Sequence, residues 1–226
     1  MTAKKLLLPF FYLCMFSVFI YIAGCVNVEQ KTTLKEDGSG SMKLHYWTKM
    51  SNLNMGDEIG GFSFSDDKVK SDFTSGNCTP SDVKIEEKLD DSTKHVNLMV
   101  TFKDINKLSD AKGFSKTKQS WTKGKDGMDF KYTLMKDTAN AGQMGMNEYK
   151  LSYTFEFPAE VTATNGNKDG KTVTWNKTVA DLTNDVDMTA TVKTEGGKKC
   201  GLFGYELPVI FLFGMTFMYT VRRRKK

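Results

Sequence analysis

The residue with the clearest chemical role is a cysteine that closes an apolar N-terminal segment. The segment ends in Ile22-Ala23-Gly24-Cys25, an aliphatic residue and two small residues before a cysteine, which is the lipobox pattern of bacterial signal peptides. The small residues let a peptidase reach the peptide bond, and the Cys25 thiolate is the nucleophile that takes a diacylglycerol. With Lys4 and Lys5 ahead of the apolar run, the pattern predicts an export signal over residues 1–24 and lipid attachment at Cys25. The alternative is an uncleaved transmembrane helix with an incidental cysteine.

A second apolar run, residues 201–221, is followed directly by five basic residues, 222–226. A helix of this length spans about 31 Å, close to the thickness of a hydrocarbon core. Basic residues directly after such a helix favour the cytoplasmic side. We therefore predict a linker at 196–200, a transmembrane helix at 201–221 and a cytoplasmic tail at 222–226. The remaining domain, residues 25–195, is then on the outer face of the cell membrane, periplasmic if there are two membranes. The alternatives are a sorting signal that is removed after export, and a core helix.

The charge of the middle of the chain argues against a nucleic-acid partner. The formal net charge of +5 comes from the two ends, and all three arginines lie in the tail. Residues 26–200 carry 25 lysines against 26 acidic residues. Nucleic-acid binding needs a basic patch on the folded domain, which this balance does not supply.

Between the two apolar ends, apolar and polar residues alternate with a period of two. This alternation is typical of strands with one buried face, and such strands usually pair antiparallel. Turn residues at 37–40, 90–93, 125–127 and 165–170 separate the segments. Short helices are predicted at 66–73 and 104–112, and a loop at 140–147. The alternating segments are 42–46, 96–102, 130–134, 151–157, 173–175 and 188–192.

An aromatic face is the feature of the domain with most functional potential. If the sheet curls around a space, these aromatic residues line an apolar pocket suited to an acyl chain. The alternative is that they fill the core; the sheet could equally be covered by helices or by a second sheet. The aromatic residues on the apolar side of their strands are Tyr46, Phe102, Phe130, Tyr132, Tyr153, Phe155, Phe157 and Trp175.

Several stretches resemble the LppM-like family of bacterial lipoprotein domains, over most of residues 25–193. The resemblance implies an α+β domain, with a curved antiparallel sheet and one or two short helices, that binds lipid-like envelope molecules; a β-sandwich is the alternative fold. Members of the family often share the lipobox and a C-terminal helix. The stretches are CVNV at 25–28, LKEDGSG at 34–40, VKIEE at 83–87, DINKL at 104–108, FP at 157–158 and GKTVTW at 170–175.

We find no pattern of catalytic or metal-binding residues. His45 and His95 fall on polar strand faces, where exposed side chains are expected, and no cysteine or histidine cluster has metal-ligand spacing. Cys78 and Cys200 could form a disulfide or remain thiols. We therefore expect a non-enzymatic, membrane-anchored envelope lipoprotein without metal or cofactor. The family resemblance, together with the aromatic face, implies that its domain binds a lipid or a lipid-linked glycan. The alternative is a structural or partner-binding module for a membrane complex; no protein partner is identified.

Overall fold

The computed structural model of the chain describes residues 26–54, 56–137 and 145–193, which fall in one structural unit. The predicted signal peptide, Cys25, the linker, the 201–221 segment and the basic tail lie outside these residues. So does most of the predicted 140–147 loop. Within the described ranges, the search for a helix long and apolar enough to cross a membrane found none.

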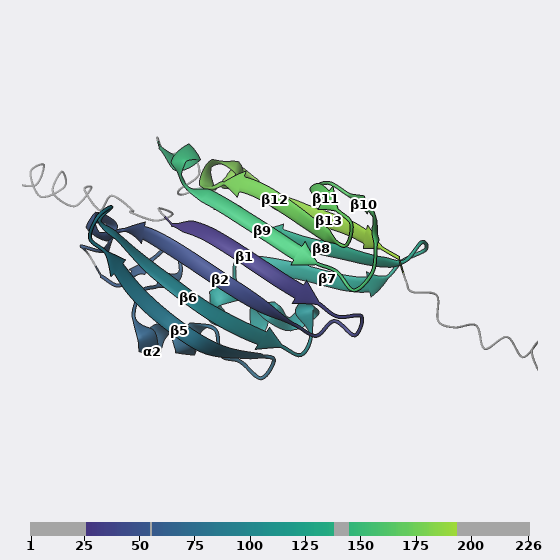
Figure 1. Cartoon of the computed structure of the whole chain (residues 1–226), viewed down its shortest axis with the longest axis horizontal. Helices are drawn as coiled ribbons and strands as arrows, with labels where there is room; N and C mark the ends of the chain where they lie inside the picture. The colour runs from purple at the N-terminus through teal and green to yellow at the C-terminus, as the bar shows by residue number, and fades with distance from the viewer. Residues whose placement is uncertain (1–25, 55, 138–144, 194–226) are drawn as a thin grey trace, which may run out of the picture. The chain divides into compact units, whose positions relative to one another are not determined.

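The larger of the two main sheets has seven strands, and Figure 1 shows most of them side by side. Each predicted segment of alternation in this sheet forms a strand, with its apolar residues buried on one face. In order across the sheet, the strands are β11 (Asn167–Asp169), β12 (Thr172–Thr178), β9 (Lys150–Glu156), β1 (Asn27–Leu34), β2 (Gly40–Lys49), β6 (Thr93–Phe102) and β5 (Cys78–Lys88).

A second sheet of four strands packs against part of the first. Its inner face carries Phe130, whose ring centroid lies 4.7 Å from that of Phe155 on β9 and 6.2 Å from that of Trp175 on β12. A separate two-stranded hairpin is formed by β3 (Glu58–Ile59) and β4 (Phe62–Ser63). The strands of the second sheet, in order, are β10 (Val161–Thr164), β13 (Val186–Val192), β8 (Met128–Leu134) and β7 (Thr117–Lys123).

The helices are few and short. The helix predicted at 66–73 is confirmed as α2 (Asp66–Asp72). The predicted 104–112 helix is instead two 3-10 segments, η2 (Ile105–Asp110) and η3 (Lys112–Phe114), because the backbone between them is extended at Ala111. Asp104 caps the first of these segments, since its side chain accepts a hydrogen bond from the Asn106 amide at 2.9 Å. The other 3-10 segments are η1 (Met50–Leu53), η4 (Met146–Glu148) and η5 (Val179–Thr183).

The fold differs from the expected α+β domain with one antiparallel sheet in three respects. It has two packed sheets, as in the sandwich alternative, and its helical content is smaller than an α+β domain implies. In addition, β1 pairs with β9 in parallel. Alternation reports which face of a strand is buried but not which strand is its partner, and the hydrogen-bonded Asn27 and Lys150 are 123 residues apart. The mostly β character of the prediction is confirmed.

The turn predictions hold where the turn joins neighbouring strands. Residues 37–40 join β1 to β2, residues 90–93 join β5 to β6, and residues 125–127 join β7 to β8. The 165–170 stretch is more elaborate than a hairpin turn, because β10 pairs in the small sheet and β11 in the large one. Asn165 and Gly166 thus carry the chain from one sheet to the other.

A cavity at one end of the domain

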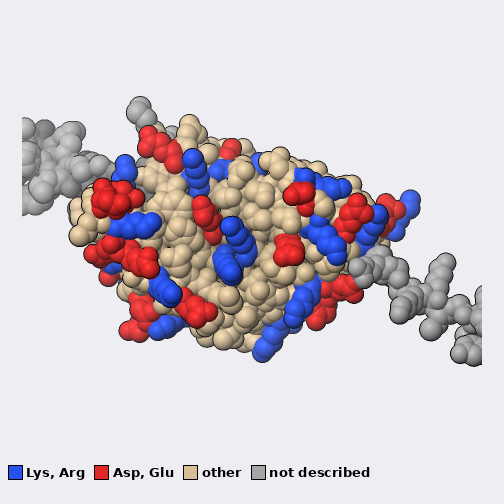
Figure 2. Space-filling view, in the orientation of Figure 1, with Lys and Arg blue, Asp and Glu red and all other residues tan. Residues whose placement is uncertain are grey.

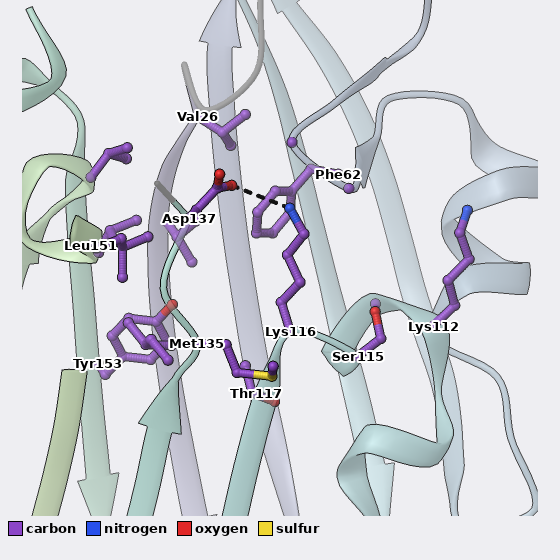
Figure 3. A pocket seen from close by; sticks show the side chains of 17 residues that line it. Val26, Phe62, Lys112, Ser115, Lys116, Thr117, Met135, Asp137, Leu151 and Tyr153 are labelled. Atoms are coloured by element: carbon purple, nitrogen blue, oxygen red, sulfur yellow. Dashed lines mark hydrogen bonds and ion pairs between the residues drawn. The ribbon is translucent and has the colours of Figure 1, made fainter. Parts of the chain in front are cut away.

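The described residues line a partly open cavity of about 150 Å³, seen in Figure 3. The cavity lies where the first residues of β1 and β9 come close to the last residues of β8 and the first of β7. The β3–β4 turn, η3 and η5 complete its outline. The side chains and backbone that line it are those of Val26, Val28, Gly60, Gly61, Phe62, Lys112, Gly113, Ser115, Lys116, Thr117, Leu134, Met135, Asp137, Leu151, Tyr153, Val179 and Leu182.

The walls of the cavity are apolar because they continue the buried faces of the strands. Val28, Leu134 and Leu151 are each at most 5% exposed and lie at the ends of strands from both sheets. The β3–β4 hairpin turns through Gly60 and Gly61, whose φ angles are +61° and +90°. A two-residue turn with both φ values positive favours glycine, so no side chain from the turn itself fills the space.

The rim of the cavity is polar and carries both signs of charge. Lys116 forms an ion pair with Asp137 at 3.2 Å, drawn as a dashed line in Figure 3. Lys112, Ser115 and Thr117 add an ammonium group and two hydroxyls. An apolar interior with a polar rim suits a molecule that has an aliphatic part and a polar part.

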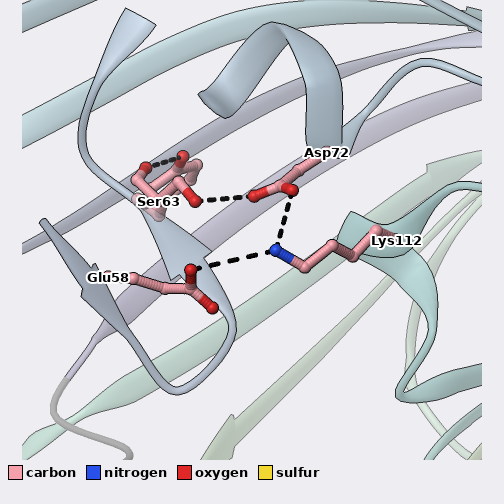
Figure 4. A network of polar contacts seen from close by, with 5 residues as sticks. Glu58, Ser63, Asp72 and Lys112 are labelled. Atoms are coloured by element: carbon pink, nitrogen blue, oxygen red, sulfur yellow. Dashed lines mark hydrogen bonds and ion pairs between the residues drawn. The ribbon is translucent and has the colours of Figure 1, made fainter. Parts of the chain in front are cut away.

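A network of polar contacts holds the β3–β4 hairpin beside the cavity, as Figure 4 shows. The Asp72 side chain, only 7% exposed, accepts a hydrogen bond from the Ser63 hydroxyl at 2.6 Å and pairs with Lys112 at 3.0 Å. Lys112 also lies 3.8 Å from Glu58. The buried Tyr46 hydroxyl donates to the Ser63 carbonyl at 2.5 Å. The Asp72 carboxylate at the end of α2 thus connects to the hairpin through Ser63 and to η3 through Lys112.

Replacing Asp72 by asparagine is expected to lower the free energy of unfolding by about 1–3 kcal/mol, because Ser63 and Lys112 lose a charged acceptor in a buried place. Denaturant unfolding followed by tryptophan fluorescence measures this loss. Asp66→Asn is the matched control, because Asp66 is half exposed and pairs with Lys70 on the surface of α2; it should change stability by less than about 0.5 kcal/mol. Equal effects of the two substitutions would contradict a structural role for the buried carboxylate.

Two tyrosines and their neighbours form a polar cluster between the sheets. Burial raises the pKa of Tyr132 to about 12, against hydrogen bonds with Thr117, Gln119 and Gln30 that lower it. Burial and, to a smaller extent, the neighbouring Tyr132 raise the pKa of Tyr153 well above its ordinary value. Both phenols therefore stay neutral at physiological pH. The Gln119 Oε1 atom is buried and has no hydrogen-bond partner among the described residues. Buried polar atoms are normally satisfied, so this acceptor is available to a bound group or to water.

The structure places all eight predicted aromatic residues in the interior, each at most 6% exposed. Tyr153 lines the cavity. The other seven pack in the core, where rings such as Phe155 and Phe157 lie in mutual contact. The second sheet covers Phe155 and Trp175 through Phe130, and the β3–β4 hairpin covers Tyr46 through Phe62. The large sheet therefore does not curl around a space there. The seven are Tyr46, Phe102, Phe130, Tyr132, Phe155, Phe157 and Trp175.

Several lining residues were not singled out from the sequence. Lys112 is the first residue of η3, and Lys116 and Asp137 lie between elements, so no local pattern marks the three as neighbours. The sequence feature that could have pointed to Val26 and Val28 is their alternation with Asn27, directly after the predicted lipid attachment site. Strand alternation identified the wall residues Leu134 and Leu151 as buried but not as the border of a cavity.

The expectation of two exposed histidines is wrong for His95. Its side chain is buried, with an exposure of 5%, because the His45 and Trp47 rings stack beside it on the outer face of the sheet. His45 retains a side-chain exposure of 31%. A residue on the polar face of a strand is therefore buried where neighbouring aromatic rings cover it.

The described part of the chain contains one cysteine, Cys78, and it is a buried thiol. Burial raises the pKa of the Cys78 thiol, which lowers its thiolate fraction and its reactivity. Cys200 lies outside the described residues.

Charged residues of both signs are scattered over the surface. On the face of the described residues seen in Figure 2, lysines and acidic residues are interspersed, with uncharged surface between them. The large sheet contributes Lys31 and Lys43 to its outer face, and Glu29 and Glu156 beside them.

Comparison with known proteins connects this fold to one family. The family described as LppM domain matches residues 48–194, which is more than half of the chain. Among solved structures, the folded domain of the LppM protein of Mycobacterium tuberculosis, determined by NMR, is 18% identical. The match covers 76% of this chain and 91% of that one, with a TM-score of 0.44. A search of curated proteins found no match.

Proposed function

Because the chain belongs to the LppM domain family, we propose that it is an envelope lipoprotein whose domain binds a lipid or a lipid-linked glycan without catalysing a reaction. Cys25 carries the acyl anchor in this proposal, and residues 201–221 span the cell membrane with the domain outside. The domain then works at the membrane surface as a binding module.

The cavity is the observation that carries the proposal. Pockets for drug-sized ligands usually measure about 300–1,000 Å³, whereas this one measures about 150 Å³. A volume of this size accepts part of an acyl chain rather than a whole lipid. The polar group and the rest of the chain would then lie at the rim, next to Lys112, Lys116 and Asp137.

One residue of the cavity lining is next to the predicted acylation site in the sequence, and this supports a ligand taken from the membrane. Val26 lines the cavity and directly follows Cys25 in the sequence. Acyl chains on Cys25 would enter the bilayer, each buried methylene contributing about 0.8 kcal/mol. The anchor therefore brings the cavity close to the lipid surface.

Photo-crosslinking in membranes tests the proposal. A palmitic acid analogue with a diazirine on its chain is added to isolated membranes that contain the full chain, and the labelled peptides are mapped by mass spectrometry. We expect labels at the start of β1 and the start of β9. Leu182→Trp, which places an indole in the cavity wall, should reduce labelling about tenfold, the effect of about 1.4 kcal/mol in binding.

Leu89→Trp is the matched control, because Leu89 is 79% exposed and does not line the cavity. Its labelling should equal that of the unmodified chain. Equal labelling of both variants, or labels spread over the surface, would reject the cavity as a lipid site. An unlabelled cavity, together with capture of one dominant protein by a protein crosslinker placed on the domain surface, would instead support the partner-binding alternative.

A further inference from the structure

The two histidines of the chain, the only ones in its sequence, meet on the outer face of the large sheet. They come from neighbouring antiparallel strands, His45 from β2 and His95 from β6. In the register of these strands His45 is opposite Asn97 and His95 is opposite Trp47, so the two imidazoles are diagonal neighbours. The pairing brings together residues that are 50 positions apart.

The geometry of the pair is specific. The Nε2 atom of His45 lies 3.0 Å from the Nδ1 atom of His95, and the two rings are nearly parallel, at 15°. The Trp47 ring stacks on His45 with a centroid distance of 4.6 Å. His95 is buried beneath this group, while His45 remains open to solvent on one side.

The outward-facing ring nitrogens of both histidines already have partners. His45 Nδ1 lies 3.5 Å from the Glu29 carboxylate. His95 Nε2 lies 2.7 Å from the Thr93 hydroxyl, which is itself hydrogen-bonded to Asp91. Histidines that bind metals usually have such a partner on the second nitrogen, which fixes the ring and its tautomer. The two nitrogens left over are the pair that face each other.

We propose that His45 and His95 bind a divalent transition-metal ion through these facing nitrogens. Metal–imidazole bonds measure about 2.0–2.1 Å, so two ligands at right angles are about 2.9 Å apart and two tetrahedral ligands about 3.4 Å apart. The observed 3.0 Å falls within this range. The ion would lie about 1.4 Å off the line between the nitrogens and replace the proton that they share.

The class of ion follows from the ligands. Imidazole suits zinc, copper and nickel, and the general order of affinities places Cu(II) first. Among the described residues, no third His, Cys, Asp or Glu side chain is placed to hold a metal together with these two. Two histidines are therefore the protein ligands, and water completes the coordination. The site is separate from the cavity, whose lining includes neither histidine.

Titration of the full chain with Cu(II) in detergent tests the proposal, using a purification tag without histidine. We expect saturable binding of one ion, quenching of the fluorescence of Trp47, and electron paramagnetic resonance splitting from two imidazole nitrogens. The chain has no third histidine, so splitting of this kind can come only from His45 and His95.

Three substitutions and one control distinguish this site from binding elsewhere. His45→Asn or His95→Asn should abolish the two-nitrogen splitting and weaken binding by at least about tenfold, and Glu29→Gln should weaken it about tenfold through its contact with His45. Lys43→Gln, on the exposed face of the same strand, should bind like the unmodified chain. Binding that is unchanged in both histidine variants, or no saturable binding at all, would overturn the proposal and leave a pair that only shares a proton.

Discussion

Replacing Phe130 by alanine should lower the free energy of unfolding by about 3–5 kcal/mol, the usual cost of removing a buried phenylalanine side chain. Phe130 is 2% exposed and joins the two sheets. Its ring contacts Phe155, Phe157 and Trp175 on the side of the large sheet, and Trp121 on its own sheet. Removing it leaves a void that lies between both layers and that neither can fill without moving.

Guanidinium unfolding of the full chain in detergent measures this effect. All three tryptophans, Trp47, Trp121 and Trp175, lie in the domain, so their fluorescence reports its unfolding. Leu89→Ala is the control, since Leu89 is exposed and should change stability by at most about 0.5 kcal/mol. A loss below about 1 kcal/mol for Phe130→Ala would mean that the two sheets do not depend on this contact.

Replacing Cys25 by serine should leave the whole chain as an unprocessed precursor in the membrane, with residues 1–24 still attached. A serine hydroxyl cannot replace the thiolate as the nucleophile that accepts diacylglycerol, and without acylation the signal peptidase of lipoproteins does not cleave. The expected change is complete rather than graded, because the modification is covalent. Electrophoretic mobility and incorporation of labelled palmitate measure it.

Cys14→Ser is the matched control for this experiment, since Cys14 lies in the same leader but outside the lipobox. It should be processed and labelled like the unmodified chain. Normal cleavage and palmitate labelling of the Cys25→Ser variant would refute the acyl anchor. In that case the cavity would also lose its connection to the membrane surface through Val26.

Local patterns in the sequence predicted the buried faces of the strands. Alternation with a period of two placed Tyr46, Phe155 and Trp175 on apolar faces, and all three are buried. Turn residues between neighbouring strands predicted the β1–β2 and β5–β6 connections, and the 66–73 helix was confirmed as α2. These features depend on residues close together in the chain, where side-chain spacing and backbone preferences act directly.

The binding sites could not be predicted in the same way. The cavity needs the first residues of β1 and β9 beside the ends of β7 and β8, and the histidine pair needs β2 beside β6 in one register. A shift of that register by one residue would place His95 on the other face. The sequence of a single strand does not indicate which other strand it pairs with.

The sequence by itself thus determined which side chains avoid water, where the chain turns and which cysteine is the candidate for acylation. Only the tertiary structure decided that two main sheets pack together, that β1 and β9 run parallel, and that a small cavity lies among the strand ends in the described residues, with one of the eight predicted aromatic rings, that of Tyr153, in its lining. The physical reason is how far apart in the sequence the interacting residues are. Alternation and turns are fixed by neighbours a few residues apart. The pairing of β2 with β6 and of β1 with β9, and the cavity, depend instead on segments that are 50 to 123 residues apart in the chain.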